Sequence, residues 1–232
     1  MTLAASVIWP YRTPDAPTAR RYPDQVPLRL DLAEPRVDLA PLSAALAEGA
    51  CAIVPTDTVY GIGCAAYHRD ACRRLYAVKA RPREQPTALV LGTVDNLLEH
   101  VLPELLGRIA GLCRRALPGP LTLVVPNPGR RFAYLCGDTP EKIGVRVPHL
   151  PAGVAALADA VGGLALTSAN LRGEPAPARL EDVPEELRSL AAVEIDAGRV
   201  GGTPSSVIDV TGPEPVLLRR GPDADSAMTL LR

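Results

Sequence analysis

The stretch "APLSAALAEGACAIVPTDTVYGIGC", residues 40–64, shows the alternation on which the fold rests. Its first part, "APLSAALAEGA", predicts a helix, with Pro41 in the first turn and Gly49 as the stop. "CAIVPT" follows as a short apolar strand, and we expect "DTVYGIGC" to form a loop. A helix that leads directly into a buried strand and a polar loop is typical of an α/β domain.

The same alternation continues along the chain. Further helices are expected at residues 69–80, 93–100, 103–117, 151–161 and 184–190. Further strands are expected in "TALVLG", "LTLVVP", "KIGVRVP", "GLALTSAN", "AVEID", "SSVIDV" and "PVLLRR". Interleaved strands and helices predict an α/β domain with a mixed sheet over residues 37–232. Residues 1–36, rich in Pro, Arg and Asp, are expected to form an extended N-terminal arm.

The composition places the chain among ordinary globular proteins. Apolar residues make up 47% of the 232 residues and charged residues 22%. The net charge of −1 provides no overall field that would attract nucleic acid. Five cysteines without a CxxC pair, and three scattered histidines, favour reduced thiols in a cytoplasmic protein over a zinc site. No apolar run approaches the roughly 18–20 residues that span a bilayer, so no membrane contact is expected.

Lysine is rare in this chain, and one of its two positions opens a distinctive segment. Of the 25 basic residues only Lys79 and Lys142 are lysines, and Lys79 begins "KARP". Pro82 disfavours helix at Arg81, so the preceding helix is expected to end near residue 79. If Lys79 and Arg81 point the same way from an extended segment, they form a doubly cationic clamp for an anion. The alternative is a solvated pair that the helix dipole stabilises at the C-terminus of the helix.

Three other polar stretches lie at strand ends, where α/β proteins place their sites. "PTDTVYGIG", residues 55–63, offers hydroxyl and backbone N–H donors for an anionic ligand. "LTSAN", residues 166–170, presents Ser168 and Asn170 at the end of a strand. "GGTPSSVIDV", residues 201–210, would let its backbone approach a phosphate closely. Each stretch, taken alone, is also typical of an ordinary turn or flexible loop.

The motifs of several common nucleotide and hydrolase sites are missing from the sequence. There is no GxxxxGK[ST], no GxGxxG after a strand, no HExxH and no GxSxG. A Ser–His–Asp triad has little support, because none of the three histidines lies in the four polar stretches. Basic and hydroxyl side chains without an evident nucleophile or base suit catalysis by positioning and charge neutralisation. Phosphoryl and nucleotidyl transfer proceed largely on those terms.

In their order along the chain, these stretches resemble the YrdC/Sua5 family of threonylcarbamoyl-AMP synthases. "PTDTVYGIG" is similar to the family's PT[ED]TVYGLG segment, and "KARPREQP" to its K-x-R-P segment. "PGPLTLVVP", "GVRVP", "TSANLRGEPAP" and "GTPSSVIDVTGPEPVLLRRG" also match at suitable spacing. The similarity runs from about residue 40 to residue 221, and six motifs in succession are far more specific than any one of them.

The resemblance implies a fold, a reaction and a set of partners. The implied fold is a twisted, mixed α/β sheet, flanked by helices, with a concave, positively charged face. The implied enzyme is a nucleotidyltransferase that forms threonylcarbamoyl-AMP and pyrophosphate from L-threonine, bicarbonate and ATP. Partner proteins would then transfer the threonylcarbamoyl group to an adenosine of tRNA. Mg²⁺ is expected to accompany ATP, with no metal ligands from the protein, and no organic cofactor is expected.

The resemblance also assigns residues to the site. It implies that Lys79 and Arg81 are catalytic, because they would place positive charge between two anions that must meet, a carbamate and the α-phosphate of ATP. It implies that substrates are bound by Thr56, Tyr60, Arg146, Ser168, Asn170, Ser205 and Arg219. The chain departs from the family at Thr87, where a leucine is usual, and in the apolar "ALVLG", where some members carry a histidine. These departures concern the contacts to threonine and not the class of reaction.

Three other interpretations stay open from the sequence. A concave basic face could hold RNA, tRNA included, although the net charge and an aromatic content of 3% disfavour an RNA-binding module. Related domains also occur in larger carbamoyltransferases that handle carbamoyl-adenylate. The third is a paralogue that has kept the fold and lost the activity, against which the complete Lys-Arg-Ser-Asn set argues.

Overall fold

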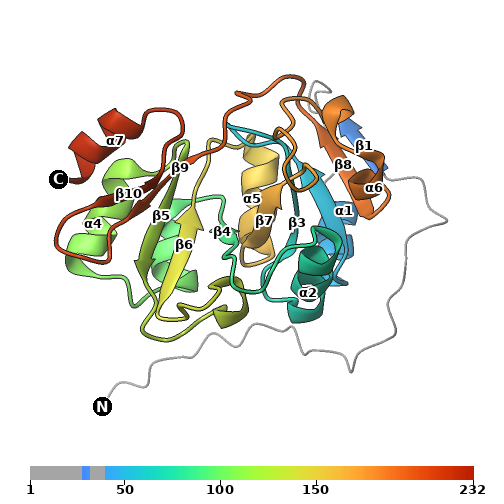
Figure 1. Cartoon of the computed structure of the whole chain (residues 1–232). Helices are drawn as coiled ribbons and strands as arrows, with labels where there is room; N and C mark the ends of the chain where they lie inside the picture. Colours follow the sequence, from blue (N-terminus) through green and yellow to red (C-terminus); the bar gives the residue numbers. More distant parts are fainter. Residues whose placement is uncertain (1–27, 32–39) are drawn as a thin grey trace, which may run out of the picture.

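Ten strands form one mixed sheet in the described part of the chain, which comprises residues 28–31 and 40–232 of the computed structural model (Figure 1). Their order across the sheet is β1-β8-β2-β3-β7-β4-β6-β5-β9-β10. Parallel and antiparallel pairs are mixed, since β2 runs antiparallel to β3 and parallel to β8. The sheet confirms the α/β class and the mixed sheet predicted from the sequence. The strands are β1 (Leu28–Asp31), β2 (Cys51–Val54), β3 (Gly61–Ala65), β4 (Ala88–Val90), β5 (Leu121–Pro126), β6 (Lys142–Arg146), β7 (Leu164–Ser168), β8 (Ala191–Asp196), β9 (Ser206–Asp209) and β10 (Val216–Arg219).

Helices lie on both faces of this sheet. α1 ends where the sequence predicts, because Gly49, with a φ of 88°, adopts a left-handed conformation that glycine accepts without strain. A π-helical turn, Leu97–Val101, continues α3, and 3-10 turns occupy Ala133–Leu135 and Leu180–Asp182. The α-helices are α1 (Ala40–Ala47), α2 (Arg69–Val78), α3 (Val94–Asn96), α4 (Gly107–Ala116), α5 (Ala152–Ala160), α6 (Glu185–Arg188) and α7 (Ala224–Leu231).

Side chains alternate between the two faces along the central strands. In β6, Ile143 and Val145 are buried on one face, here called the core face, where α2, α4 and α7 complete the larger hydrophobic cluster. Lys142, Gly144 and Arg146 point to the other face, here called the cavity face. Helices α1 and α5 pack on the cavity face in a second, smaller cluster. Because they cover only part of that face, the remainder stays open to a ligand.

Strand β3 corrects the sequence prediction, which placed a loop over residues 57–64. The second half of that segment is a fully buried strand, paired with β2 and β7. Its two glycines weaken the strand pattern in the sequence, but the packing requires them. A Cβ on Gly63 would lie 2.6 Å from the Ala165 carbonyl oxygen, and one on Gly61 would lie 2.9 Å from the Leu166 side chain. The two glycines of β3 therefore leave room for the Leu166 side chain of the neighbouring strand β7.

The helices also differ from the prediction in places. The helix expected at 103–117 begins only at Gly107, and the one expected at 93–100 is a single turn of α3 followed by the π-helical turn. Helix α7, which the sequence analysis did not predict, packs against α4 (Figure 1). Among the described helices, none combines the length and the apolar character that crossing a membrane demands.

Part of the predicted N-terminal arm belongs to the sheet. Residues 28–31 form the edge strand β1, which pairs in parallel with β8. The rest of the predicted arm, residues 1–27 and 32–36, lies outside the described residues.

Candidate active site

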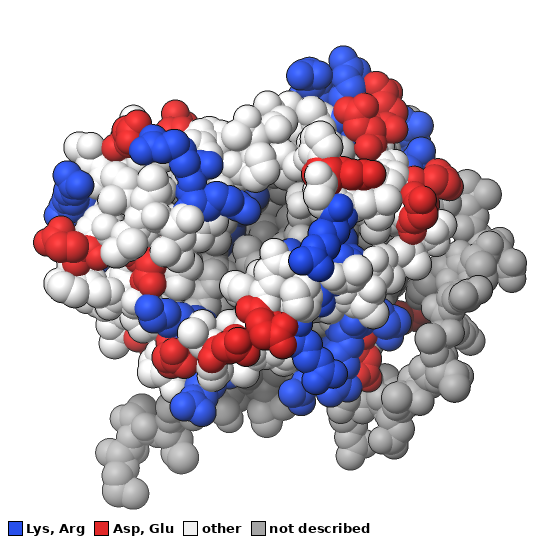
Figure 2. Space-filling model, in the orientation of Figure 1, with Lys and Arg blue, Asp and Glu red and all other residues white. Residues whose placement is uncertain are grey.

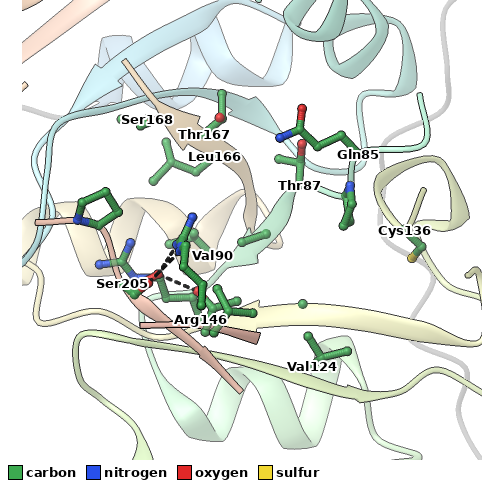
Figure 3. Close-up of a pocket in the computed structure, with 18 of the residues that line it drawn as sticks. Gln85, Thr87, Val90, Val124, Cys136, Arg146, Leu166, Thr167, Ser168 and Ser205 are labelled. Carbon is green, nitrogen blue, oxygen red and sulfur yellow. Dashed lines mark hydrogen bonds between the residues drawn. The ribbon is translucent and has the colours of Figure 1, made fainter. Parts of the chain in front are cut away.

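A cavity of about 460 Å³ opens on the cavity face, a volume typical of small-molecule sites. Its lining comes from β3, β4, β5, β6, β7, β9 and β10 and from loops between them. Figure 2 shows a hollow near the middle of the molecule, with Lys and Arg side chains on both sides of it. In the close-up, Arg146 and Ser205 lie at one end of the cavity, and Gln85, Thr87 and Cys136 lie toward the other (Figure 3).

The structure brings eight of the nine predicted site residues to this cavity. Lys79 and Asn170 lie beside it, and hydrogen bonds link both of them to Ser168. Tyr60 is the exception and is directed elsewhere. Those that line the cavity directly are Thr56, Arg81, Arg146, Ser168, Ser205 and Arg219.

Lys79 caps the C-terminus of α2 and turns its ammonium group toward the end of β7. Its Nζ donates to the backbone carbonyls of Ser168, at 2.9 Å, and of Asn170, and lies 3.4 Å from the Asn170 side-chain oxygen. The residue is only 9% exposed, so the alternative of a solvated Lys79–Arg81 pair at the helix end is wrong for Lys79. Burial, helped by the charge of Arg81, lowers the pKa of Lys79 to about 8.

Arg81 reaches the cavity from a tight turn and not from the extended segment that the sequence analysis expected. Ala80 has a φ of 44°, and the Arg81 N–H donates to the Tyr76 carbonyl at 2.9 Å, so the chain reverses direction at the end of α2. The Arg81 guanidinium donates to Thr167 Oγ1 and to the Gln85 carbonyl, both at 3.3 Å. The predicted end of the helix near residue 79 is confirmed, but the geometry of the clamp differs.

Arg146, at the end of β6, is held by the loop that follows β2. Its Nη2 donates to the Asp57 carboxylate and to Thr58 Oγ1 at 2.6 Å, and lies 3.4 Å from Thr56 Oγ1. The side chains of Arg146 and Asp57 are 9% and 11% exposed, so this ion pair is buried. Burial lowers the pKa of Arg146, and Asp57 opposes that shift. The buried Arg146 Nε has no hydrogen-bond partner among the described residues.

Arg219, on β10, fixes Ser205 at the same end of the cavity. It donates from Nε to the Ser205 carbonyl and from Nη2 to Ser205 Oγ, both at 3.0 Å. Ser205 Oγ also shares a hydrogen bond with Thr122 Oγ1 at 2.9 Å. Burial lowers the pKa of Arg219, and the charges of Arg146 and Arg81 lower it further. The guanidinium groups of Arg146 and Arg81 therefore both repel that of Arg219, and a bound anion would relieve that repulsion.

Tyr60 is fully buried, and its hydroxyl does not line the cavity. The hydroxyl donates to the Gly198 carbonyl at 2.7 Å and accepts from the Ala197 N–H at 3.0 Å. It also lies 3.3 Å from Asp196 Oδ1. These contacts join β3 to the loop after β8, so the position of Tyr60 gives its predicted contact with substrate no support.

The cavity carries unbalanced positive charge. Four basic side chains line it, and no acidic one does among the described residues. Two of the four are neutralised by carboxylates, in the ion pairs Arg146–Asp57 and, at 2.9 Å, Lys142–Asp209. An excess of positive charge in a partly enclosed site favours a polyanionic ligand. The cations with no ion pair to a carboxylate in the described ranges are Arg81, Arg219 and, beside the cavity, Lys79.

Sequence reasoning missed several residues that the structure places at the site. Asp57 and Thr167 lie inside stretches singled out for their hydroxyls, and neither was assigned a role. Lys142 lies four positions before Arg146 in one strand, so the two-residue period of a strand puts both on the same face. That period is the signal that could have identified Lys142.

The site offers no ready place for a protein-bound metal ion. Within the described residues, no group of three or more His, Cys, Asp or Glu side chains could hold one. The cavity lining supplies hydroxyl groups and cations, whereas Mg²⁺ prefers carboxylate and other oxygen ligands. A metal ion that acts here would be held through oxygens of the ligand itself.

Comparison with known proteins links the chain to one family. A family model named for Sua5, YciO and YrdC, with the description "Telomere recombination", matches residues 44–221. The threonylcarbamoyl-AMP synthase of Bacillus subtilis (strain 168) is 32% identical over 186 residues, covering 79% of this chain and 53% of that protein. The threonylcarbamoyl-AMP synthase of Homo sapiens is 34% identical over 206 residues, covering 82% of this chain and 71% of that protein. The chain thus spans about half the length of the bacterial relative.

A solved structure agrees with the sequence relatives. Pyrococcus abyssi Sua5, in complex with L-threonine, superimposes with a TM-score of 0.72 at 28% identity, covering 90% of this chain and 62% of that one. The family model alone covers most of the chain, and it includes every predicted site residue from Thr56 to Arg219. The chain therefore belongs to the Sua5/YciO/YrdC family.

Proposed function

We propose that the protein is an L-threonylcarbamoyladenylate synthase, a nucleotidyltransferase that joins L-threonine, bicarbonate and ATP into threonylcarbamoyl-AMP and pyrophosphate. The observation that carries the proposal is a group of cations at one cavity, Lys79, Arg81 and Arg219, that form no ion pair with a carboxylate of the described residues. The names of the B. subtilis and human relatives support the same reaction. So does the L-threonine bound to the P. abyssi relative.

The proposed reaction needs positive charge at one point in space. The amine nitrogen of L-threonine attacks the carbon of bicarbonate, and loss of water leaves a carbamate. A carbamate oxygen then attacks the α-phosphorus of ATP, and the bond from that phosphorus to the pyrophosphate oxygen breaks. Two unit charges of like sign about 4 Å apart repel by about 4 kcal/mol at an effective dielectric constant of about 20. Cations fixed at the meeting point offset this repulsion and stabilise the added charge of the transition state.

Lys79 and Arg81 are the residues we assign to that role. Both side chains are held in place before a ligand arrives. Lys79 donates to the Ser168 and Asn170 carbonyls. Arg81 donates to Thr167 and to the carbonyl of Gln85, in the loop that follows Arg81. Preorganised charge of this kind costs no reorganisation during the reaction. Ser168 and Asn170 share a hydrogen bond at 2.6 Å beside the ammonium group, which suits them to orient the reacting carboxylate.

The other end of the cavity suits the phosphates of ATP. Arg219 and Arg146 lie near enough for their charges to interact, and Ser205 and Thr56 add hydroxyl groups. Arginine binds phosphate oxygens through two parallel hydrogen bonds, and Arg146 Nε is a buried donor that no described residue engages. Mg²⁺ would enter on the phosphates of ATP, where it neutralises part of their charge.

The product has a reactive mixed anhydride bond between the carbamate and the phosphate of AMP. We infer that a separate transfer protein accepts it and passes the threonylcarbamoyl group to an adenosine of tRNA, in the cytoplasm where ATP and tRNA are available. Binding of tRNA to this chain is not required by the proposal, because the charge of the cavity is accounted for by ATP and the carbamate.

Mass spectrometry of the product tests the proposed function. Incubation of the purified chain with ATP, Mg²⁺, L-threonine and bicarbonate should yield the mass of threonylcarbamoyl-AMP together with one equivalent of pyrophosphate. Omission of threonine, with carbamoyl phosphate supplied instead, tests the alternative carbamoyltransferase activity. Carbamoyl-AMP as the only adenylate, or the absence of any adenylate from a chain that binds ATP, would overturn the proposal.

A further inference from the structure

Three cysteine side chains meet on the core face of the sheet, on the side opposite the cavity. Cys51 of β2 and Cys64 of β3 are directly paired across two antiparallel strands. Cys72, in the first turns of α2, packs over them, and its Sγ lies 3.7 Å from Cys64 Sγ. We call Cys51, Cys64 and Cys72 the thiol cluster. Cys64 is its centre, because it pairs with Cys51 across the two strands and its Sγ faces that of Cys72.

The members of the thiol cluster differ in accessibility. Cys64 and Cys72 are buried, whereas Cys51 is partly exposed, so Cys51 is the member of the thiol cluster nearest to solvent. Arg74 donates from Nη2 to the carbonyl of Gly49 at 2.8 Å, which brings its positive charge to the start of β2. A hydrogen bond with Cys64 lowers the pKa of the Cys51 thiol, and the Arg74 charge lowers it further. The thiolate is the form of cysteine that reacts with oxidants.

The remaining two cysteines provide a contrast within the same chain. Cys113 and Cys136 are buried, no hydrogen bond between described residues joins either one to another thiol, and burial raises the pKa of each to about 11. The thiol cluster is also not a metal site, since no group of three or more potential ligands in the described ranges could hold a metal ion. The Sγ atoms of Cys64 and Cys72 are in van der Waals contact, so oxidation to a disulfide is a chemistry open to the thiol cluster.

We propose that the thiol cluster is a redox modification site, at which a hydroperoxide oxidises Cys51 and Cys64 resolves it as a disulfide. In the first step the Cys51 sulfur attacks the hydroperoxide and breaks its O–O bond, which gives Cys51 sulfenic acid and an alcohol, or water from hydrogen peroxide. In the second step the Cys64 sulfur attacks the sulfenic sulfur. The S–S bond forms, and water leaves with the hydroxyl group of Cys51 and the proton of Cys64.

The geometry allows the disulfide in two positions. Residues directly opposite in an antiparallel pair have Cα atoms about 4.5 or 5.5 Å apart, and both values lie within the range of about 4.4–6.8 Å that disulfides span. From the bond between Cys51 and Cys64, attack by Cys72 on the Cys64 sulfur forms a second disulfide and releases the Cys51 thiolate. The Sγ atoms of Cys64 and Cys72 must approach from 3.7 Å to about 2.05 Å, which side-chain rotation and a small shift of α2 can supply. A dithiol reductant reverses both.

Peptide mapping of the intact chain tests the proposal. The protein is treated with hydrogen peroxide, alkylated at its free thiols, digested and analysed by mass spectrometry. We expect loss of two of the five thiols per chain, in peptides that join Cys51 to Cys64 or Cys64 to Cys72, and full recovery with dithiothreitol. Five free thiols after a treatment that oxidises glutathione in the same tube, or a disulfide that contains Cys113 or Cys136, would overturn the proposal.

Two variants separate the thiol cluster from its surroundings. Cys64→Ser removes the sulfur that both disulfides need, so the cross-linked peptides should be lost and Cys51 sulfenic acid should be trapped by dimedone. Cys113→Ser, a buried thiol outside the cluster, should leave the yield of cross-linked peptides unchanged. If Cys64→Ser loses its native circular dichroism, Cys51→Ser at the half-buried position replaces it and should reduce the yield of the Cys64–Cys72 peptide at a matched time. An unchanged yield in a folded Cys51→Ser or Cys64→Ser variant would contradict the proposed order of steps.

Discussion

Lys79 Nζ donates a hydrogen bond to the backbone carbonyl of Ser168, 2.9 Å away, although the two residues are 89 positions apart in the sequence. The contact ties the end of α2 to the end of β7, and the sheet order places β7 beside β3, the strand that precedes α2 in the chain. It orients a buried ammonium group toward the end of the strand where polar side chains gather. The charge at the site therefore depends on tertiary structure, and its removal can be tested without disturbing a helix interior.

Lys79→Ala should lower the kcat/KM for pyrophosphate release by about 10²–10³-fold, the usual cost of losing one preorganised group that stabilises transition-state charge. Lys79→Arg should also be impaired, because a planar guanidinium cannot place its donors on both the Ser168 and Asn170 carbonyls as a compact ammonium does. Arg73→Ala is the matched control, since Arg73 is an exposed cation on the same helix and should leave the rate unchanged. Wild-type rates in a folded Lys79→Ala variant would remove Lys79 from the mechanism.

The lowered pKa of Lys79 predicts a pH dependence of ATP binding. Lys79 is charged below its pKa of about 8 and neutral above it, so affinity for ATP should decrease as the pH rises through that value. ATP favours the charged form, so binding above pH 8 should take up a proton. Titration calorimetry without threonine measures both effects and avoids the ionisation of the substrate amine. The same pH profile in Lys79→Met would show that another group is responsible.

The buried ion pair between Asp57 and Arg146 predicts a separation of stability from activity. Asp57→Asn should lower the free energy of unfolding by about 3–5 kcal/mol, because it leaves a buried guanidinium without its carboxylate. The double variant with Arg146→Met should recover most of that loss in urea denaturation, yet stay inactive because Arg146 lines the cavity. Glu181→Gln, in an exposed pair with Arg179, should change stability by less than about 1 kcal/mol. Additive losses in the double variant would argue against direct coupling of the pair.

Two glycine positions predict opposite changes in stability. A Cβ on Gly92 would overlap the backbone carbonyl of Ala155 on α5, so Gly92→Ala should lower the free energy of unfolding by about 1–3 kcal/mol or more. Gly111 lies within α4, and among the described residues no atom other than its chain neighbours and the backbone of its own helix lies within 4 Å of the place its Cβ would take. Gly111→Ala should therefore raise the free energy of unfolding by about 0.5–1 kcal/mol. If Gly92→Ala and Gly111→Ala changed the thermal denaturation midpoint equally, the packing of α5 on β4 would be looser than described.

Much of the fold follows from local sequence pattern, and its exceptions have tertiary causes. Short apolar runs bounded by proline or glycine predict most of the strands, because a strand buried on both faces is apolar along its whole length. Strand β3 escapes that pattern since Gly61 and Gly63 are required by the Leu166 side chain on a strand distant in sequence. Strand β1 is four residues long, and its partner β8 begins at residue 191, so pairing across the chain creates it.

The sequence predicted which residues form the site better than it predicted where their side chains point. Motif resemblance named residues that do gather at one cavity, but it cannot say where each side chain points. Tyr60 bonds to the loop after β8, and Arg81 emerges from the left-handed turn at Ala80. Both outcomes depend on backbone conformation, which composition and spacing do not determine. Asp57, the partner of Arg146, is 89 positions away in sequence and becomes apparent only when the sheet is assembled.

The alternation along β6 has a consequence for how this protein can vary. Deletion of one residue within Lys142–Arg146 would turn the side chains on one side of the deletion to the opposite face of the sheet. A cation would then lie among the leucines of the core face, or Ile143 or Val145 would lie on the cavity face. Changes of chain length are thus restricted to the connections between strands. Substitution at every second position, by contrast, can reshape ligand preference while the hydrophobic interior stays intact.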